Sequence, residues 1–232
     1  MSEDPDSAIE TPRAARERWC TFIRDNTRLL APPLVPEIRL HLAEESLPIW
    51  QKTEDELGEM NVPPPYWAFA WAGGQALARC LLDAPRLASG KRVLDLGTGS
   101  GLTAIAAMKA GAASMLAADI DAVSLIATEL NAEANGVTVA VTAEDLLARA
   151  PDPYDVILVG DLFYEKALAD HVLAYIEAAT ARGADVLIGD PQRNYFPRDR
   201  FQKIAEYHVP VTRELEDSEI KRTAVWREAA RR

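Results

Sequence analysis

The chain has 232 residues and a net charge of −11, because 36 aspartates and glutamates outnumber 25 lysines and arginines. A chain of this length forms one domain with a sizeable core. Its acidic balance disfavours a nucleic acid or an anionic membrane surface as the main partner. Its two cysteines lack metal-ligand spacing, its first residues are acidic, and no apolar stretch reaches 18 residues. We therefore expect a cytoplasmic protein without disulfides, signal peptide or membrane span.

The first part of the chain has an irregular pattern. We expect a tail up to about residue 12, a helix over residues 14–30 that a proline cluster ends, and a half-buried strand at residues 38–42. Residues 47–66 show no periodicity and include three consecutive prolines. We interpret residues 1–72 as an N-terminal extension that forms a lid, not as a domain of its own.

Strands alternate with helices from residue 73 onward. The hydrophobic patterns predict strands at residues 92–96, 114–118, 137–141, 154–160 and 184–189. They predict helices at residues 75–82, 102–110, 122–135, 166–181 and 199–206. A hairpin is expected to follow, with strands at residues 207–213 and 220–227 and an acidic connection at 214–219. The alternation implies an α/β fold for residues 73–232, with a Rossmann-like, seven-stranded, mostly parallel sheet, helices on both faces and a C-terminal antiparallel hairpin.

A glycine-rich turn follows the first strand of this region. Glycines permit positive φ angles and let a ligand lie against the backbone, at the sheet edge where open α/β folds bind ligands. A dinucleotide site would need its third glycine at position 102, where the chain has leucine. An acid two residues before the first glycine instead suits the ammonium group of S-adenosylmethionine, which has no pyrophosphate. The residues assigned to this cofactor are Asp95, Gly97, Thr98, Gly99 and Gly101.

Acidic residues also follow the next two strands. Asp119 lies 18 residues after the last glycine of the turn, where a carboxylate accepts hydrogen bonds from ribose hydroxyls. We expect Asp121 to cap the following helix instead of binding a ligand. Asp145 follows the third strand. It suits either the adenine amino group or the start of a helix, and the sequence leaves both interpretations open.

Several of these motifs resemble those of class I S-adenosylmethionine-dependent methyltransferases, over residues 75–226. The segment PYWAFAWAGGQ at residues 65–75 and the Asp-x-x-Tyr motif at residues 161–164 are similar to those of the seven-β-strand protein-lysine methyltransferases. Further matches lie at residues 189–191, 214–217 and 223–227. Within this family the chain looks most like the enzymes that methylate the β-subunit of electron-transfer flavoprotein. The resemblance thus implies that protein as the substrate and S-adenosylmethionine as the cofactor.

The resemblance also implies roles for individual residues. Asp161 would orient the incoming lysine ammonium, and Tyr164 with Phe163 would form the walls of the lysine channel. Three residues would lie at the cofactor: Trp71, Gly73 and Gln75. Three other aromatic residues are expected in the core: Trp67, Phe69 and Trp226.

Other functions remain as alternatives. Residues 93–112 also resemble the methyltransferase of a large-subunit ribosomal protein, although that family has an asparagine-led motif where this chain has Asp161. A small amine is another possible acceptor. A non-catalytic binding module is a different class, and an intact glycine turn with Asp95 and Asp119 weighs against it. The three histidines are scattered, so we expect no metal, and we expect a monomer.

Overall fold

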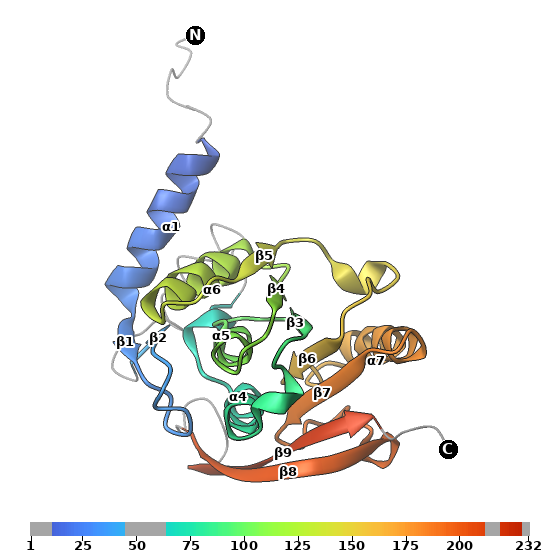
Figure 1. The fold of residues 1–232 in the computed structure, drawn as a ribbon. Helices are drawn as coiled ribbons and strands as arrows, with labels where there is room; N and C mark the ends of the chain where they lie inside the picture. Colours follow the sequence, from blue (N-terminus) through green and yellow to red (C-terminus); the bar gives the residue numbers. More distant parts are fainter. Residues whose placement is uncertain (1–10, 45–63, 212–218, 229–232) are drawn as a thin grey trace, which may run out of the picture.

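The computed structural model describes residues 11–44, 64–211 and 219–228 (Figure 1). Its helices are α1 (Pro12–Asn26), α4 (Ala72–Asp83), α5 (Leu102–Lys109), α6 (Ala122–Ala134) and α7 (Lys166–Ala181). Its strands are β1 (Arg28–Leu30), β2 (Leu40–Leu42), β3 (Arg92–Leu96), β4 (Ser114–Ala118), β5 (Ala140–Thr142), β6 (Val156–Gly160), β7 (Asp185–Asp190), β8 (Phe201–Pro210) and β9 (Ile220–Glu228). Short 3₁₀ turns are η2 (Tyr66–Ala68), η3 (Pro85–Leu87), η4 (Leu146–Ala148) and η5 (Arg198–Arg200).

A seven-stranded sheet has the order β5-β4-β3-β6-β7-β9-β8. The strands from β5 to β7 are parallel, and β9 pairs antiparallel with both β7 and β8. The chain runs outward from β3 to β4 and β5 and then returns to β6 on the other side of β3. Leu96 and Val159 therefore pair at the carboxyl ends of β3 and β6, at the switch point where open α/β sheets bind ligands. The predicted fold class is confirmed.

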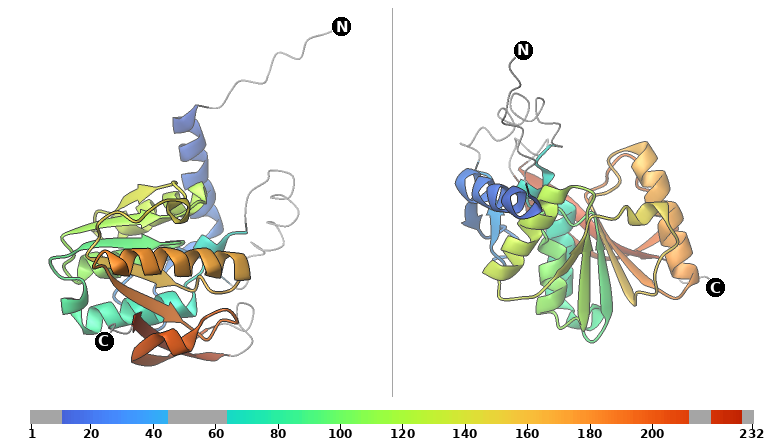
Figure 2. Two further views of the ribbon diagram at one scale, coloured as in Figure 1. Left: turned by 90° about the vertical axis from the view of Figure 1, so that its right-hand side faces the viewer. Right: turned by 90° about the horizontal axis from the view of Figure 1, so that it is seen from above.

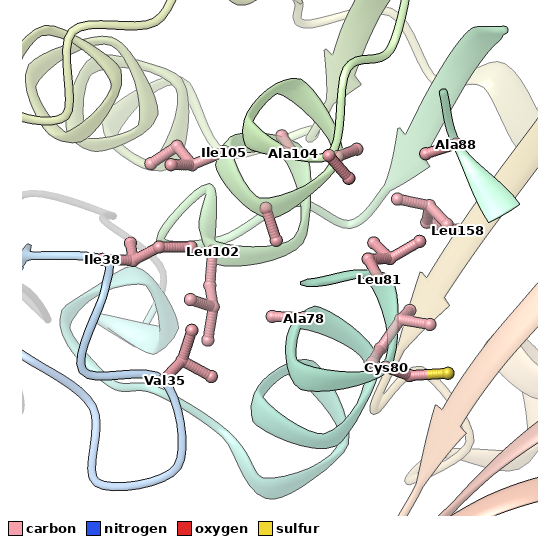
Figure 3. Packing of buried hydrophobic residues seen from close by; sticks show 14 of the residues in the cluster. Val35, Ile38, Ala78, Cys80, Leu81, Ala88, Leu102, Ala104, Ile105 and Leu158 are labelled. Carbon is pink, nitrogen blue, oxygen red and sulfur yellow. The ribbon is translucent and has the colours of Figure 1, made fainter. Parts of the chain in front are cut away.

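Side chains alternate between the two faces of the sheet, which gives each face its own core. Val93 and Leu158 pack in the cluster with α4 and α5, whereas Leu94 and Val159 pack in the cluster with α7. Figure 2 shows α7 and α4 on opposite faces of the sheet. Figure 3 shows Leu158 near Leu81 of α4 in the first of these cores. The buried strands are consequently apolar on both sides.

The described part of the N-terminal extension packs on α6 and on the first core. Ile23 of α1 is fully buried in a cluster with Val123 and Leu130 of α6, and Arg16 forms an ion pair of 2.8 Å with Glu129. Residues of β2 and the turn before it, such as Leu40, join the core of α4 and α5. The extension is therefore tied to the sheet domain, and its function as a lid stays a prediction.

The helix predicted over residues 14–30 is wrong at its end. The helix stops at Asn26, and residues 28–30 form β1, which pairs antiparallel with β2. Thr27 has an extended backbone, and its hydroxyl donates a hydrogen bond of 2.5 Å to the carbonyl of Ile23. Leu29 and Leu30 continue the helical spacing in the sequence, but the pairing with β2 overrides it.

The helix predicted over residues 199–206 is wrong. After the short turn η5 the chain forms β8 from Phe201 onward. The pairing of β8 with β9 shifts register between Lys203 and Ala205, so Ile204 is an extra residue in the strand. Phe201, Ile204 and Ala205 stand at helical spacing in the sequence although all three lie in the strand. Most of the predicted acidic connection at 214–219 lies outside the described residues.

Candidate functional site

The glycine turn lies between β3 and α5 in a conformation that favours glycine. The φ angles of Gly97, Gly99 and Gly101 are 63°, 51° and 78°, a region that L side chains rarely adopt. A Cβ atom on Gly97 would lie 2.6 Å from Leu162, and one on Gly101 would lie 3.0 Å from Thr128. A Cβ atom on Gly99 would meet nothing closer than 4.0 Å. The turn thus leaves the most open space at the half-buried Gly99, while Leu162 brings the β6–α7 connection against Gly97.

Asp95 lies beneath this turn and is 1% exposed. Its Oδ2 accepts hydrogen bonds from the hydroxyls of Thr98 at 2.7 Å and Thr103 at 2.6 Å. Burial raises the pKa of Asp95 to about 6, because a carboxylate loses its hydration there. Asp95 and Thr98 therefore organise the turn from below, and their contact with a cofactor stays a prediction.

Asp119 supports the turn from the end of β4. Its Oδ2 accepts a hydrogen bond from the amide of Gly99 at 2.9 Å, and its Oδ1 accepts one from the amide of Asp121 at 3.0 Å. Burial raises the pKa of Asp119 above its usual range. Asp121 caps α6 by accepting a hydrogen bond of 2.9 Å from the amide of Val123, which confirms that prediction.

Ile120 is a site candidate that the sequence analysis missed. Its side chain is 78% exposed, although it stands between Asp119 and Asp121 directly after a buried strand. An apolar side chain so exposed beside a carboxylate and a bare backbone turn offers a surface on which a flat heterocycle can lie. The available signal was a large apolar residue between two acids at the carboxyl end of a strand.

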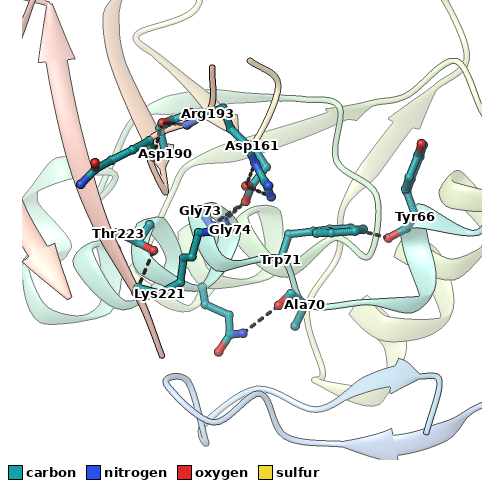
Figure 4. Close-up of polar contacts among 12 residues, drawn as sticks. Tyr66, Ala70, Trp71, Gly73, Gly74, Asp161, Asp190, Arg193, Lys221 and Thr223 are labelled. Carbon is teal, nitrogen blue, oxygen red and sulfur yellow. Dashed lines mark hydrogen bonds and ion pairs between the residues drawn. The ribbon is translucent and has the colours of Figure 1, made fainter. Parts of the chain in front are cut away.

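Asp161 begins the β6–α7 connection with a φ angle of 59°, which is unusual for a residue other than glycine. It is 8% exposed. Its Oδ2 accepts hydrogen bonds from the amides of Gly73 at 2.5 Å and Gly74 at 3.1 Å (Figure 4). These amides belong to the first turn of α4, whose N-cap residue Trp71 makes no side-chain capping bond. The carboxylate of Asp161 therefore caps α4 from another segment.

Arg193 binds the other oxygen of this carboxylate. Its Nε and Nη2 donate hydrogen bonds to Asp161 Oδ1 at 3.1 and 2.8 Å, and its guanidinium carbon lies 5.9 Å from the centre of the Trp71 ring. Asp190 Oδ1 accepts hydrogen bonds from the amides of Gln192 and Arg193 at 2.7 and 2.9 Å. The sequence analysis noted Asp190 as a family match only and did not single out Arg193.

Asp190 is fully buried, and its Oδ2 has no hydrogen-bond partner among the described residues. Burial, and then the negative charge of Asp161, raise the pKa of Asp190 to about 6. Two carboxylates and one guanidinium thus meet where β6 and β7 end.

Three aromatic side chains near the start of α4 and the β6–α7 connection form what we call the aromatic cluster: Tyr66, Trp71 and Tyr164. The ring centre of Tyr66 lies 5.9 Å from that of Trp71 and 6.1 Å from that of Tyr164. The indole Nε1 of Trp71 donates a hydrogen bond of 2.9 Å to the carbonyl of Tyr66. Tyr66 and Tyr164 are 44% and 47% exposed, so their faces are available to a cation.

Phe163 was expected beside Tyr164 in the channel, and that expectation is wrong. Its side chain is fully buried and packs edge-on against Phe196 with 5.0 Å between ring centres. Phe163 thus belongs to the core that packs with α7. Three aromatic residues pack against the cores as expected: Trp67, Phe69 and Trp226.

Two residues assigned to the cofactor have clear packing functions. Gly73 lies where a Cβ atom would collide with the carbonyl of Gly189 and the carboxylate of Asp161, so it lets α4 approach β7. The Gln75 side chain accepts a hydrogen bond of 3.2 Å from the amide of Leu34 and donates one of 2.7 Å to the carbonyl of Ala70. Cofactor contacts for Gly73 and Gln75 stay predictions.

Asp145 caps the short turn η4, and its Oδ1 accepts a hydrogen bond of 3.1 Å from the amide of Leu147. Of the two interpretations that the sequence left open, this contact supports the start of a helical turn. A contact of Asp145 with adenine stays a prediction.

The described parts of the chain hold neither a metal-binding cluster nor a membrane-spanning helix. No group of three or more His, Cys, Asp or Glu side chains there is arranged to hold a metal ion. No helix within those ranges is long and apolar enough to cross a bilayer. Cys20 and Cys80 are both buried free thiols.

The switch point, the glycine turn and the acid after β4 are features of nucleotide-binding α/β folds, and the comparisons with known proteins show that this one is a class I S-adenosylmethionine-dependent methyltransferase fold. The S-adenosylmethionine-dependent methyltransferase from Thiobacillus denitrificans, solved in complex with S-adenosyl-L-homocysteine, matches 67% of this chain and 91% of its own chain. Its TM-score is 0.50 at 16% identity, which shows the shared fold. The family model of the ribosomal protein L11 methyltransferase (PrmA) matches residues 75–179, less than half of the chain.

Closer relatives match nearly the whole chain. The electron transfer flavoprotein beta subunit lysine methyltransferase of Danio rerio is 38% identical over 89% of this chain and 81% of its own length. That of Xenopus laevis is 37% identical over 96% of this chain and 92% of its own length. The chain belongs to the electron transfer flavoprotein beta subunit lysine methyltransferase family. The resemblance inferred from the sequence motifs is confirmed.

Proposed function

We propose that this chain transfers the methyl group of S-adenosylmethionine to lysine side chains of the electron-transfer flavoprotein β-subunit. Membership of the family supports this proposal. Its structural support is the fixed carboxylate of Asp161 beside the aromatic cluster, because Leu162 brings this region against the glycine turn at Gly97. A cation-binding site thus adjoins a nucleoside-binding turn.

The residues around the turn fit the cofactor. The open space at Gly99 and the carboxylate of Asp119 suit an amino-acid chain and a ribose, and Ile120 offers an apolar face to adenine. Asp95 adds negative charge beneath the turn, which favours an ammonium group. When bound, the cofactor supplies a methyl group on a positively charged sulfur, ready for direct transfer to a nucleophile.

The acceptor site must hold a lysine side chain and let it lose its proton. A free lysine has a pKa of about 10.4, and desolvation together with a nearby positive charge lowers it. The oxygens of Asp161 already accept hydrogen bonds from Arg193 and from two amides of α4. We therefore assign Asp161 to the orientation of the lysine and not to proton removal. Tyr66 and Tyr164 offer aromatic faces that tolerate a methylated ammonium.

The surroundings proposed for the reaction follow from charge and thiol chemistry. The net charge of −11 suits a protein substrate that presents a basic segment, and a nucleic-acid partner is not proposed. Cys20 and Cys80 as free thiols are compatible with the cytoplasm. We propose that the protein acts as a monomer.

A methyl-transfer assay tests the proposal. Wild type and Asp161→Ala are incubated with labelled S-adenosylmethionine and with purified flavoprotein β-subunit, ribosomal protein L11 or a small amine. We expect label on lysines of the flavoprotein subunit, lost in Asp161→Ala and kept in Asp170→Ala, whose carboxylate pairs with Lys166 on the surface of α7. Label on L11 or on the amine instead would show that the acceptor is not the flavoprotein subunit. Cofactor binding without transfer to any of them would favour a non-catalytic module.

A further inference from the structure

The carboxylate of Asp161 is held from two directions. Its Oδ2 accepts two amide hydrogen bonds from the rigid first turn of α4, at Gly73 and Gly74. Its Oδ1 accepts two hydrogen bonds from the guanidinium of Arg193, a side chain that is 20% exposed. Donors from two separate segments thus restrain both oxygens of this carboxylate. The position of Asp161 is therefore set by its partners as much as by its own backbone.

We propose that Arg193 is a positioning residue for methyl transfer, which holds Asp161 in place and balances its charge, and that Asp190 fixes Arg193. This inference rests on the proposed function. Arg193 acts through Asp161 and does not itself contact the reacting atoms.

The guanidinium group is suited to this task. Its planar fork matches one carboxylate oxygen with two N–H donors, and its face lies over Trp71 at 5.9 Å. A lysine at this position would provide a single point charge and no flat surface. Trp71 also belongs to the aromatic cluster, so Arg193 joins Asp161 to the side chains that would surround the acceptor.

Asp190 holds the backbone that carries Arg193. Its Oδ1 accepts the amide hydrogen bonds of Gln192 and Arg193, and Gln192 has a φ angle of 74° that few residues other than glycine adopt. A fully buried carboxylate with one oxygen unpartnered is unfavourable unless a positive charge lies nearby. Arg193 thus serves two carboxylates, and the turn is built around it.

Charge balance has a chemical consequence. A bare carboxylate beside the acceptor would raise the pKa of the lysine and hold its proton, which opposes attack on the methyl group. Paired with Arg193, Asp161 is neutralised while its oxygens keep their position. Other titratable groups that the described residues bring to this region include Asp190 at the end of β7, Tyr164 and Glu165 after β6, Tyr66 of η2 and Asp119 after β4.

The test measures kcat, KM and their pH dependence for wild type, Arg193→Gln and Arg193→Lys with the flavoprotein β-subunit. Arg193→Gln should lower kcat about tenfold at neutral pH and move the rise of kcat about one pH unit upward, because a tenfold effect corresponds to one unit. Arg193→Lys keeps the charge and loses the fork, so its pH profile should match wild type at a kcat reduced severalfold. Cofactor affinity should stay within about twofold in both.

Asp190 offers a matched pair of variants. Asp190→Asn retains an oxygen that can accept the amide hydrogen bonds of residues 192 and 193, so it should lose less kcat than Asp190→Ala. Asp190→Ala removes that acceptor and should reproduce the loss seen in Arg193→Gln. Equal kcat values for Asp190→Ala and wild type would contradict the part assigned to Asp190.

Other outcomes would overturn the proposal. An unchanged kcat in Arg193→Gln would do so, as would a lower KM at full kcat, because Arg193 would then be a competitor that the substrate displaces. A pH shift in Arg193→Lys equal to that in Arg193→Gln would exclude charge balance. A wild type that methylates no substrate refutes the proposed function separately. Even then, additive losses of Tm in a thermal unfolding cycle of Arg193→Gln with Asp161→Asn would contradict the pairing.

Discussion

Asp95 shows how a single residue couples stability to binding. Its carboxylate is buried beneath the glycine turn with two threonine hydroxyls as donors, and its pKa rises from 3.8 to about 6. A raised pKa in the folded state means that the stabilising contribution is complete below about pH 4 and is lost as the pH rises through about 6. A shift of about two units corresponds to about 3 kcal/mol. At neutral pH this buried charge therefore lowers stability.

Asp95→Asn should remove this pH dependence. The free energy of unfolding of the variant, minus that of wild type, should increase by about 2–3 kcal/mol between pH 4 and pH 7.5, since the amide does not ionise. Urea denaturation at both pH values measures it, and any packing difference adds an offset independent of pH. The exposed Asp170→Asn serves as the control. Cofactor affinity should also fall in Asp95→Asn at pH 7.5. If the free energies of unfolding of wild type and variant changed in parallel with pH, Asp95 would not be the group that causes the pH dependence.

The residues of the site differ in how far the sequence predicts them. The glycine turn, Asp119 and the cap Asp121 are visible because each follows a strand within a short local pattern. The pairing of Arg193 with Asp161 is not, because it joins side chains 32 residues apart through a turn that the sequence pattern does not define. Phe163 was placed in the lysine channel because of its position in the motif, but its side chain is fully buried. A motif position does not show which way a side chain points when the backbone nearby has an unusual conformation, as at Asp161.

At the scale of elements, the close approach of α4 to β7 positions Asp161. Gly73 and Gly74 both donate amide hydrogen bonds to its carboxylate, but only Gly73 lies against the backbone of Gly189. A Cβ atom on Gly74 would meet nothing within 4 Å. Two adjacent glycines therefore have different requirements, which makes them a matched pair.

Gly73→Ala should lower the free energy of unfolding by about 1–3 kcal/mol, because the methyl group separates α4 from β7. Methyl transfer should fall with it, since the Asp161 carboxylate must move. Gly74→Ala should be neutral or stabilising by about 0.5–1 kcal/mol, as alanine favours the helix. Chemical denaturation and the methyl-transfer assay measure both. Equal losses in the two variants would argue against the tight contact at Gly73.

Strands and helices were predicted well where burial in the core gives the sequence a regular hydrophobic periodicity. The strands at 92–96 and 114–118 and the helix at 166–181 have the predicted bounds. The strand expected at 137–141 lies slightly later, at Ala140–Thr142, where pairing with β4 begins. The errors at 28–30 and 201–206 arose where pairing with the next strand along the chain overrode the local spacing.

At the scale of the molecule, the net charge of −11 affects the encounter with the substrate. An acidic surface attracts a basic segment over distances that salt shortens to about 8 Å at physiological ionic strength. We expect kcat/KM for the flavoprotein β-subunit to fall severalfold as salt rises from about 0.05 M to about 0.3 M, while kcat stays constant. Steady-state kinetics over a salt series measure both. A kcat that falls with salt while kcat/KM stays constant would point to an effect on the site itself.

The place of β9 in the sheet bears on the order in which the chain is made. β9 follows β8 in the sequence but lies between β7 and β8. On the ribosome, β8 emerges before the strand that joins it to the sheet, and the edge of β7 stays open until residues 220–228 have been synthesised. A nascent chain paused before that point carries two unpaired strand edges, which is where aggregation begins. Translation speed through this short segment therefore bears on the yield of folded protein.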